Sequence, residues 1–92
     1  MKKSPLVSII ILNWNGRELT KSCLESIRKN TDYSNYEIIV IDQGSKDNSI
    51  ELFEKEFPEV RLFKNNKNIG FSAGNNLGFR NANGKYLSLI HI

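Results

Sequence analysis

The sequence predicts an α/β domain in three layers, α/β/α, in which helices cover both faces of an open parallel sheet. Two observations lead to this prediction. Runs of branched apolar residues alternate with segments of helical periodicity, and the connections between them are short. We expect right-handed crossovers between the parallel strands and the spatial strand order 3-2-1-4. A chain of 92 residues provides at most one such domain.

The first half of the chain contains two predicted strands and one helix. The run LVSIIIL at Leu6–Leu12 is typical of a strand that is buried on both faces. Apolar residues then recur on one helical face from Arg17 to Asn30. A second buried strand, YEIIVI, is predicted over Tyr36–Ile41 and ends at Asp42.

The second half continues the alternation in the order helix, strand, helix, strand. The predicted elements are Ser49–Phe57, Val60–Asn65, about Ser72–Ala82, and Lys85–Ile92. Ser45, Asp47 and Asn48 are candidate N-caps of the second helix, and Asn48 with Glu51 has the spacing of a capping box. Gly84 is expected to end the third helix with a positive φ.

Composition and charge narrow the classes of function. The hydrophobic share of 39% and charged share of 25% are ordinary for a soluble globular chain. The net charge is +3, but the basic residues are scattered, so we expect no nucleic-acid partner, although an anionic small ligand would fit. The apolar run Leu6–Leu12 is too short to span a bilayer. Cys23 has no Cys or His near it for a disulfide or zinc site, which favours a cytoplasmic location.

Asp42 is the first candidate for a functional residue. In open parallel sheets, ligands bind beyond the carboxyl ends of the strands, where an acidic side chain can accept hydrogen bonds from a base or a ribose. The alternative is structural, because an Asp beside a helix N-terminus is favoured by capping and by the helix dipole. Spacing alone leaves both interpretations open for Asp42. For Asp47, which is nearer to the helix, capping is the preferred interpretation.

Two further loops are candidates for ligand contact. In NWNG, Asn13–Gly16, a tight turn exposes backbone N–H groups, and Trp14 offers an aromatic face, although a lone Trp can simply cover the core. In NIGFSAGNN, Asn68–Asn76, the start of a helix presents free N–H groups to an anion, and Asn75 and Asn76 add amides. The glycines in this stretch match no phosphate-loop spacing and could instead let the helix lie close to the sheet.

No nucleophile and base can be paired in this sequence. The sole histidine, His91, stands in an apolar strand near the end of the chain, and no serine has a His near it. A hydrolase triad is therefore not expected.

Three stretches in this order resemble the N-terminal half of a family 2 glycosyltransferase of the rhamnosyltransferase-like kind: VSIIILNWNG, YEIIVIDQGSKDNSIELFEK and NIGFSAGNNLGFRNANGKYLSLI. The resemblance runs from Val7 to about Leu89. It implies the Rossmann-like, nucleotide-diphospho-sugar transferase fold. It also implies transfer of a sugar from a UDP- or dTDP-linked donor to a saccharide or lipid-linked acceptor in polysaccharide and cell-wall synthesis. The parent protein would act in the cytoplasm, or peripherally at the inner face of the membrane.

The resemblance also assigns residues to nucleotide binding. Asp42 matches the base-binding Asp of the family, and the segment from Leu12 to Asn15 matches its base-contacting segment, with Trp14 over the base. Gly70–Asn76 matches the segment next to the donor. The residues expected to bind the nucleotide are Leu12, Asn13, Trp14, Asn15, Asp42, Gly44, Gly70, Gly74, Asn75 and Asn76.

The sequence departs from the family pattern in two places. Gln43 stands where members have Asn or Asp, which we expect to be a mild change in an exposed turn. After Leu89, members continue to an acidic pair that holds a divalent metal, Mn or Mg, whereas this chain has Ile90, His91 and Ile92. We therefore expect residues 1–92 to be an incomplete N-terminal nucleotide-sugar-binding part, truncated after about the fourth strand. Such a chain would have no catalytic residue, no metal ligand and no activity of its own.

Two alternatives remain open, together with one consequence for assembly. A nucleotidyltransferase fragment would carry a glycine- and arginine-rich loop after the first strand, which NWNGREL matches poorly. A non-catalytic interaction module of flavodoxin- or receiver-like fold is the other alternative, and nucleotide binding would distinguish it. A receiver would need an acidic pair where Asn13 and Asn15 stand. A sheet that ends at its fourth strand leaves an edge at which the chain could self-associate.

Overall fold

The computed structural model of the protein describes residues 5–91. Within them the elements are β1 (Val7–Asn13), α1 (Arg17–Asn30), β2 (Tyr36–Asp42), α2 (Ser49–Glu56), β3 (Arg61–Lys64), α3 (Phe71–Asn81) and β4 (Tyr86–His91). Every predicted element is present, with ends that differ by at most one residue. Ile92, the predicted end of the last strand, lies outside the described residues.

The four strands form one parallel sheet in the order β3-β2-β1-β4, which confirms the predicted order. β1 and β2 lie in the middle of the sheet, and their last residues, Asn13 and Asp42, are register partners. The carboxyl ends of these two strands therefore meet at one edge of the sheet, which is the edge where α/β proteins bind ligands.

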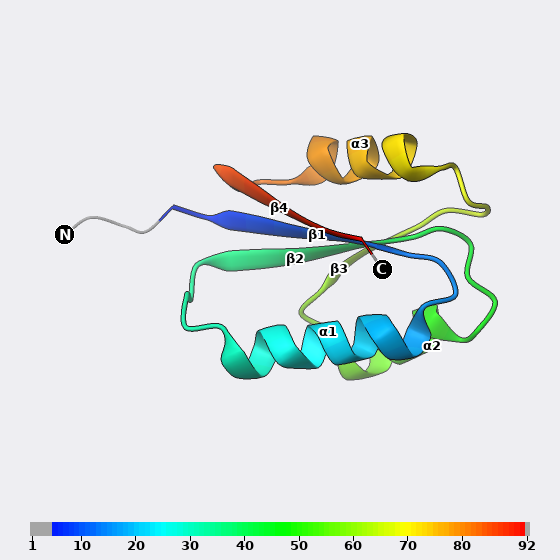
Figure 1. Ribbon diagram of the computed structural model, residues 1–92, viewed down its shortest axis with the longest axis horizontal. Coiled ribbons are helices and arrows are strands. Elements are labelled where there is room, and N and C mark those ends of the chain that lie inside the picture. Colours follow the sequence, from blue (N-terminus) through cyan, green and yellow to red (C-terminus); the bar gives the residue numbers. More distant parts are fainter. Residues whose placement is uncertain (1–4, 92) are drawn as a thin grey trace.

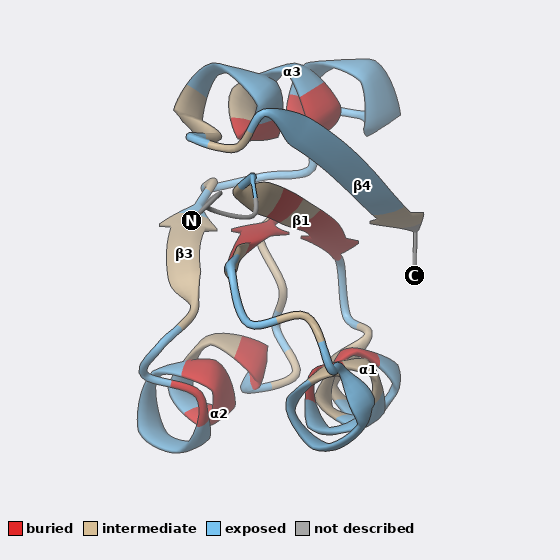
Figure 2. Ribbon diagram, turned by 90° about the vertical axis from the view of Figure 1, so that its left-hand side faces the viewer, coloured by how far each residue is buried: buried red, intermediate tan, exposed pale blue. Residues whose placement is uncertain are grey.

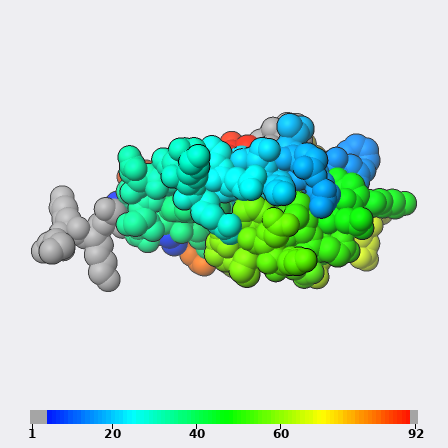
Figure 3. Space-filling model, turned by 90° about the horizontal axis from the view of Figure 1, so that it is seen from below, coloured from blue at the N-terminus to red at the C-terminus, as the bar shows by residue number. Residues whose placement is uncertain are grey.

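Helices cover both faces of the sheet, as predicted (Figure 1). On one face α1 and α2 lie side by side, as Figure 3 shows, and they enclose the larger core cluster. Its buried members are Ile11, Leu24, Ile38, Val40, Leu52, Phe53 and Phe57. α3 covers the other face over a smaller cluster of Ile10, Leu12, Ile39 and Ile41. Alternate residues of β1 and β2 thus pack into opposite layers, as the period of a strand requires.

α2 begins without the predicted capping box. Its N-cap residue, Asn48, has a left-handed backbone with φ 65° and makes no side-chain cap. The Asp47 carboxylate caps instead, because it accepts hydrogen bonds from the backbone N–H of Ser49 at 3.1 Å and of Arg17 at 3.0 Å. Partial burial would raise the pKa of Asp47, but the hydrogen bonds from Ser49 and Arg17 outweigh it and lower that pKa. One carboxylate therefore stabilises the first turns of both α1 and α2.

α3 lies close to the sheet because it has glycines on its inner face. A Cβ atom on Gly78 would come within 2.6 Å of Ile10, and one on Gly74 within 3.0 Å of Leu12. The interpretation that small residues allow close packing is therefore confirmed for these two positions.

The loop after α3 corrects the prediction for Gly84. The positive-φ glycines among the described residues are Gly44 and Gly70, so Gly84 is not left-handed. Its backbone instead passes very near β1, since a Cβ atom there would lie 2.6 Å from the backbone nitrogen of Ser8 and 2.9 Å from the Leu6 carbonyl oxygen. Gly84 is required by this close approach and not by a turn conformation.

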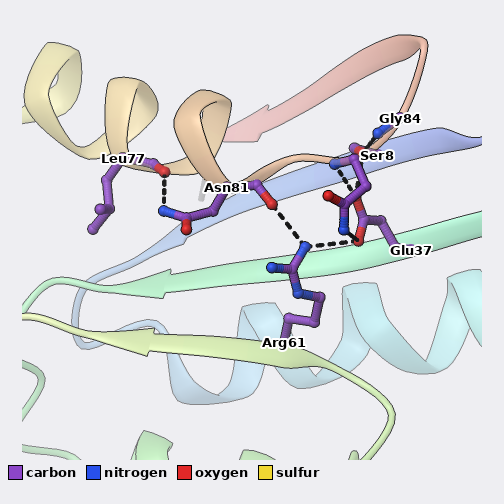
Figure 4. Close-up of polar contacts among 7 residues, drawn as sticks. Ser8, Glu37, Arg61, Leu77, Asn81 and Gly84 are labelled. Carbon is purple, nitrogen blue, oxygen red and sulfur yellow. Dashed lines mark hydrogen bonds and ion pairs between the residues drawn. The ribbon is translucent and has the colours of Figure 1, made fainter.

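A polar cluster ties this loop to the sheet at the end opposite to the ligand edge (Figure 4). The Glu37 carboxylate accepts hydrogen bonds from Ser8 Oγ at 2.5 Å, the Asn83 backbone N–H at 2.7 Å and Arg61 Nη1 at 2.8 Å. Ser8 Oγ in turn accepts the Gly84 N–H at 2.8 Å. The cluster therefore joins β1, β2, β3 and the 83–84 loop.

β4 forms an exposed edge of the sheet, as Figure 2 shows by its colour. The exposed fractions of Tyr86, Leu87 and Leu89 are 56%, 48% and 46%. These are large values for apolar side chains on a strand. In the described part of the chain, no helix is long and apolar enough to cross a membrane.

Candidate functional site at the carboxyl edge of the sheet

A hollow of about 290 Å³ lies at the carboxyl edge of the sheet, where the sequence predicts a ligand site. Its walls come from the end of β1, the residue after β2, and the segment that leads into α3. The lining residues are Leu12, Asn13, Trp14, Gln43, Asn68, Gly70 and Phe71. This volume is at the lower end of the range of small-molecule sites.

Asn13 and Asp42 form a buried polar network behind the hollow. Neither residue has exposed surface. Asn13 Nδ2 donates to Asp42 Oδ1 at 2.8 Å, and Asn13 Oδ1 accepts from Thr20 Oγ1 at 2.7 Å. The backbone N–H of Ser45 donates to Asp42 Oδ2 at 2.9 Å. The side-chain amide of Asn13 is thereby held in one orientation, and Asp42 closes the turn to Ser45 without capping α2.

The turns after β1 and β2 are joined to each other. Asn15 has a left-handed backbone with φ 51°, its N–H donates to Ser45 Oγ at 2.8 Å, and its Oδ1 accepts the Lys46 N–H at 2.8 Å. The exposed fraction of Trp14 is 57%, so the interpretation that this ring covers the core is wrong. Its aromatic face is available to a ligand in the hollow.

Gln43 corrects the prediction of an exposed turn. Its exposed fraction is 3%, and its side chain contacts the segment from Asn65 to Gly70. The next residue, Gly44, has φ 79°, and a Cβ atom there would lie 2.9 Å from Lys67 Cα. The loop after β2 and the loop before α3 are therefore in close contact.

The structure brings together only part of the predicted site. Leu12, Asn13, Trp14 and Gly70 line the hollow, whereas Asp42, Asn15, Gly44, Gly74, Asn75 and Asn76 are not among its lining residues. Asn75 is 6% exposed, and its buried Oδ1 has no partner among the described residues, whereas Asn76 is exposed on α3.

Sequence reasoning did not name Gln43, Asn68 or Phe71 among the nucleotide-binding residues, although Asn68 and Phe71 lie in the candidate loop Asn68–Asn76. Phe71 carries a signal that could have found it, because an aromatic residue in a stretch of small and polar ones is unusual.

The described residues do not fit a metal site. Among residues 5–91 there is no group of three or more His, Cys, Asp or Glu side chains that could hold a metal ion. At the ligand edge, both oxygens of Asp42 and both oxygens of Asp47 already accept hydrogen bonds from protein groups. The side chain of His91 lies outside the described residues.

A parallel sheet with a hollow at its carboxyl edge is the arrangement in which open α/β proteins bind ligands. The family model of glycosyl transferase family 2 matches residues 8–91. The chain belongs to this family, as the resemblance predicted.

Relatives support the assignment. The chain is 34% identical over 93 residues to the glycosyltransferase YibD of Escherichia coli strain K12, covering 98% of this chain and 26% of that protein. It is 36% identical over 87 residues to glycosyltransferase GlyA of Streptococcus pneumoniae, covering 91% of this chain and 12% of the relative. The chain thus spans about a quarter or less of these relatives.

Two solved structures share the fold. TarS 1-349 of S. aureus superposes with a TM-score of 0.82 at 21% identity, over 92% of this chain and 26% of that one. The mannosyltransferase PcManGT of Pyrobaculum calidifontis, solved with GDP-Man and Mn²⁺, gives a TM-score of 0.79 at 23% identity, with the same coverage of 92% and 26%. The predicted fold of the nucleotide-sugar transferases is thereby confirmed.

Proposed function

We propose that residues 1–92 form the nucleotide-binding part of a glycosyltransferase whose donor is a UDP- or dTDP-linked sugar. The observation that carries the proposal is the hollow at the carboxyl edge of the sheet, with the exposed ring of Trp14 in its wall. The full protein would transfer the sugar to a saccharide or lipid-linked acceptor in cell-surface polysaccharide synthesis. It would do so in the cytoplasm or at the inner face of the membrane.

The base subsite is proposed at the end of β1. Trp14 packs on the base, and the Leu12–Asn13 backbone lies beneath it. Asp42 acts on the base subsite from behind, because its carboxylate holds the buried side chain of Asn13 and thereby the backbone beneath the base. Gly70 and the start of α3 lie on the diphosphate side, where the N-terminal end of a helix favours an anion. Asn15, Gly44, Gly74, Asn75 and Asn76 are proposed to shape the loops around the donor.

The metal and the acceptor are proposed to bind to sequence that longer relatives carry beyond the matched region. This is supported by the Mn²⁺ and GDP-Man in PcManGT and by the short share of each relative that this chain covers. Within the described chain the carboxylates at the ligand edge are engaged by protein donors, so we derive no step through a metal. The 92-residue chain alone is proposed to bind the nucleotide without transferring sugar.

A titration of the folded chain tests this function. UDP, dTDP and GDP are added separately while Trp14 fluorescence is followed, and calorimetry on the same samples gives an independent affinity. We expect saturable quenching by UDP or dTDP, because the ring lies in the wall of the hollow. Absence of binding in a chain shown to be folded by circular dichroism would favour the alternative, a non-catalytic interaction module.

Substitution of Asp42 by Asn is the matched test of the base subsite. Asn keeps the size of the side chain but replaces one carboxylate oxygen by an NH₂ group, which cannot accept a hydrogen bond. Either Asn13 Nδ2 or the Ser45 N–H therefore loses its acceptor. We expect the preference for uracil or thymine over guanine to fall by about tenfold, as the loss of one oriented hydrogen bond predicts. The buried donors also make Asp42→Asn about 1–2 kcal/mol less stable, so binding is compared at a temperature where both proteins are folded. An unchanged base preference would contradict the assignment of Asp42.

The edge of β4 is proposed to pair with a second copy of the chain. β4 has no Asp, Glu, Lys or Arg, and its side chains Leu87 and Leu89 are about half exposed, so the usual protection of an edge strand is missing. We expect concentration-dependent dimers in sedimentation velocity, which Leu87→Lys abolishes. Leu19→Lys, at an exposed leucine of α1, is the matched control and should leave dimers unchanged. Equal dimer content in Leu87→Lys and the unmodified chain would rule out this edge.

A further inference from the structure

The side chain of Gln43 connects three segments at the ligand edge. Its Nε2 group donates to the Gly70 carbonyl oxygen at 3.0 Å. Its Oε1 atom accepts from Asn65 Nδ2 at 2.9 Å and from the Ile69 N–H at 3.4 Å. The buried side-chain amide of Gln43 therefore donates a hydrogen bond through its nitrogen and accepts hydrogen bonds through its oxygen.

The same contact includes the first turn of α3. The Gly70 carbonyl oxygen accepts the Gly74 N–H at 3.0 Å as well as the Gln43 amide. A Cβ atom on Gly74 would lie 2.4 Å from Gln43 Nε2, so the amide lies directly against the helix backbone. Only a glycine at position 74 leaves room for this arrangement.

One part of the hollow's lining comes from the segment that Gln43 contacts. Asn68, Gly70 and Phe71 form that part of the lining, and residues 66–70 are all exposed. An exposed segment with few apolar contacts opens at low free energy unless hydrogen bonds hold it. The buried side chain that holds its end is Gln43, through Ile69 and Gly70.

We propose that Gln43 is a positioning residue, which fixes the 65–70 segment and thereby the width of the hollow between Trp14 and the start of α3. The proposal deepens the proposed function and rests on it for the nucleotide, but the contact itself can be tested without a ligand. Asn would be one methylene too short to reach both partners. Glu has the right length but, when ionised, has no hydrogen for the Gly70 oxygen.

The test combines amide hydrogen exchange with UDP and dTDP binding for Gln43→Ala, Gln43→Asn and Gln43→Glu. In the first two variants we expect faster exchange over residues 66–71, unchanged exchange in β1 and β2, and about tenfold weaker binding of the nucleotide. Asn66→Asp is the matched control for the charge of Gln43→Glu, since Asn66 is exposed in the same segment and outside the lining residues of the hollow.

Gln43→Glu adds a readout that a general loss of stability does not produce. At pH 7.5 its ionised carboxylate faces the Gly70 carbonyl oxygen without a hydrogen to donate. The variant should therefore bind the nucleotide more weakly than the unmodified chain does. Burial raises the pKa of such a carboxyl above its ordinary value of about 4.3, so protonation near pH 5 restores a donor and part of the binding. For Asn66→Asp, the nucleotide affinity relative to that of the unmodified chain should be the same at pH 7.5 and at pH 5.

The outcomes separate the two proposals. If the unmodified chain binds none of the nucleotides, the proposed function fails, and the exchange data alone decide whether Gln43 holds the segment. Unchanged exchange over residues 66–71 in Gln43→Ala would overturn the positioning role. Faster exchange with unchanged affinity would also overturn it, because the segment would then not set the nucleotide site.

Discussion

Replacing Glu37 with Ala should lower the free energy of unfolding by about 3 kcal/mol at pH 7, because a largely buried network loses the carboxylate that Ser8, Arg61 and the Asn83 N–H share. Ser8 is fully buried, and the Glu37 side chain is only 14% exposed, so at Ser8 water replaces the lost partner poorly. The Arg61 guanidinium and the Asn83 N–H would also lose their carboxylate (Figure 4). The loss is measured by urea unfolding followed by circular dichroism.

A surface ion pair provides the control for Glu37→Ala. Lys64 and Glu54 contact each other at 3.2 Å, but their side chains are 51% and 55% exposed. Glu54→Ala should therefore change the free energy of unfolding by less than about 0.5 kcal/mol. A similar small effect for Glu37→Ala would show that the Glu37 cluster does not stabilise the fold.

The contribution of Glu37 should also depend on pH. Partial burial would raise the pKa of its carboxyl, but hydrogen bonds from Ser8, Asn83 and Arg61 outweigh it and lower that pKa. A group with a lowered pKa in the folded state contributes stability above its unfolded pKa, here about 4.3, and loses it as pH falls through the folded value. The difference in stability between the unmodified chain and Glu37→Gln should stay constant from pH 7 to about pH 5 and shrink below pH 4.

Gly84→Ala should destabilise the protein by about 2 kcal/mol, although a Gly to Ala change usually has the opposite sign where φ is ordinary. The added methyl group would lie 2.6 Å from the Ser8 backbone nitrogen and 2.9 Å from the Leu6 oxygen. Backbone atoms in the sheet cannot move aside as a flexible side chain can. If the loop moved away to avoid the clash, the hydrogen bonds from the Gly84 N–H to Ser8 Oγ and from the Lys85 N–H to the Leu6 carbonyl oxygen would lengthen.

Thermal unfolding tests Gly84→Ala directly, because we expect the melting temperature to fall, whereas a Gly to Ala change at an ordinary φ usually raises it. Asn83→Ala is the neighbouring control, since the backbone N–H of residue 83 still donates to Glu37 and only a side-chain contact of 3.5 Å is lost. We expect its melting temperature to change little. A Gly84→Ala protein that is as stable as the unmodified chain, or more stable, would contradict the close approach of this loop to β1.

The fold could be predicted from the sequence because its signals are local and repeated. Branched apolar runs such as Ile9–Leu12 and Ile38–Ile41 have few alternatives to buried parallel strands, and short connections leave one handedness. The strand order followed from these signals together with the resemblance. Helix and strand ends were the least accurate part, because they depend on caps.

The errors at the site come from contacts between segments far apart in the chain. Gln43 looks like a turn residue until residues 65–70 lie over it, and no pattern around position 43 indicates that contact. Gly84 resembles a helix-ending glycine in the sequence. The structure requires a glycine there because the chain passes close to the backbone of Ser8, 76 positions earlier. Asp47 was predicted as a cap of α2, but its second role at the start of α1 requires the two loops to meet.

The position of β1 in the sheet has a consequence for the folding of the nascent chain. β1 pairs with β2 on one side and with β4 on the other, and β4 occupies residues 86–91. During synthesis, one edge of the most apolar strand stays open until almost the entire matched region has left the ribosome. Contacts of such long sequence separation form slowly, and open strand edges promote association of unfinished chains. Chaperone dependence during translation should therefore be determined more by the delay before β4 than by the stability of the completed sheet.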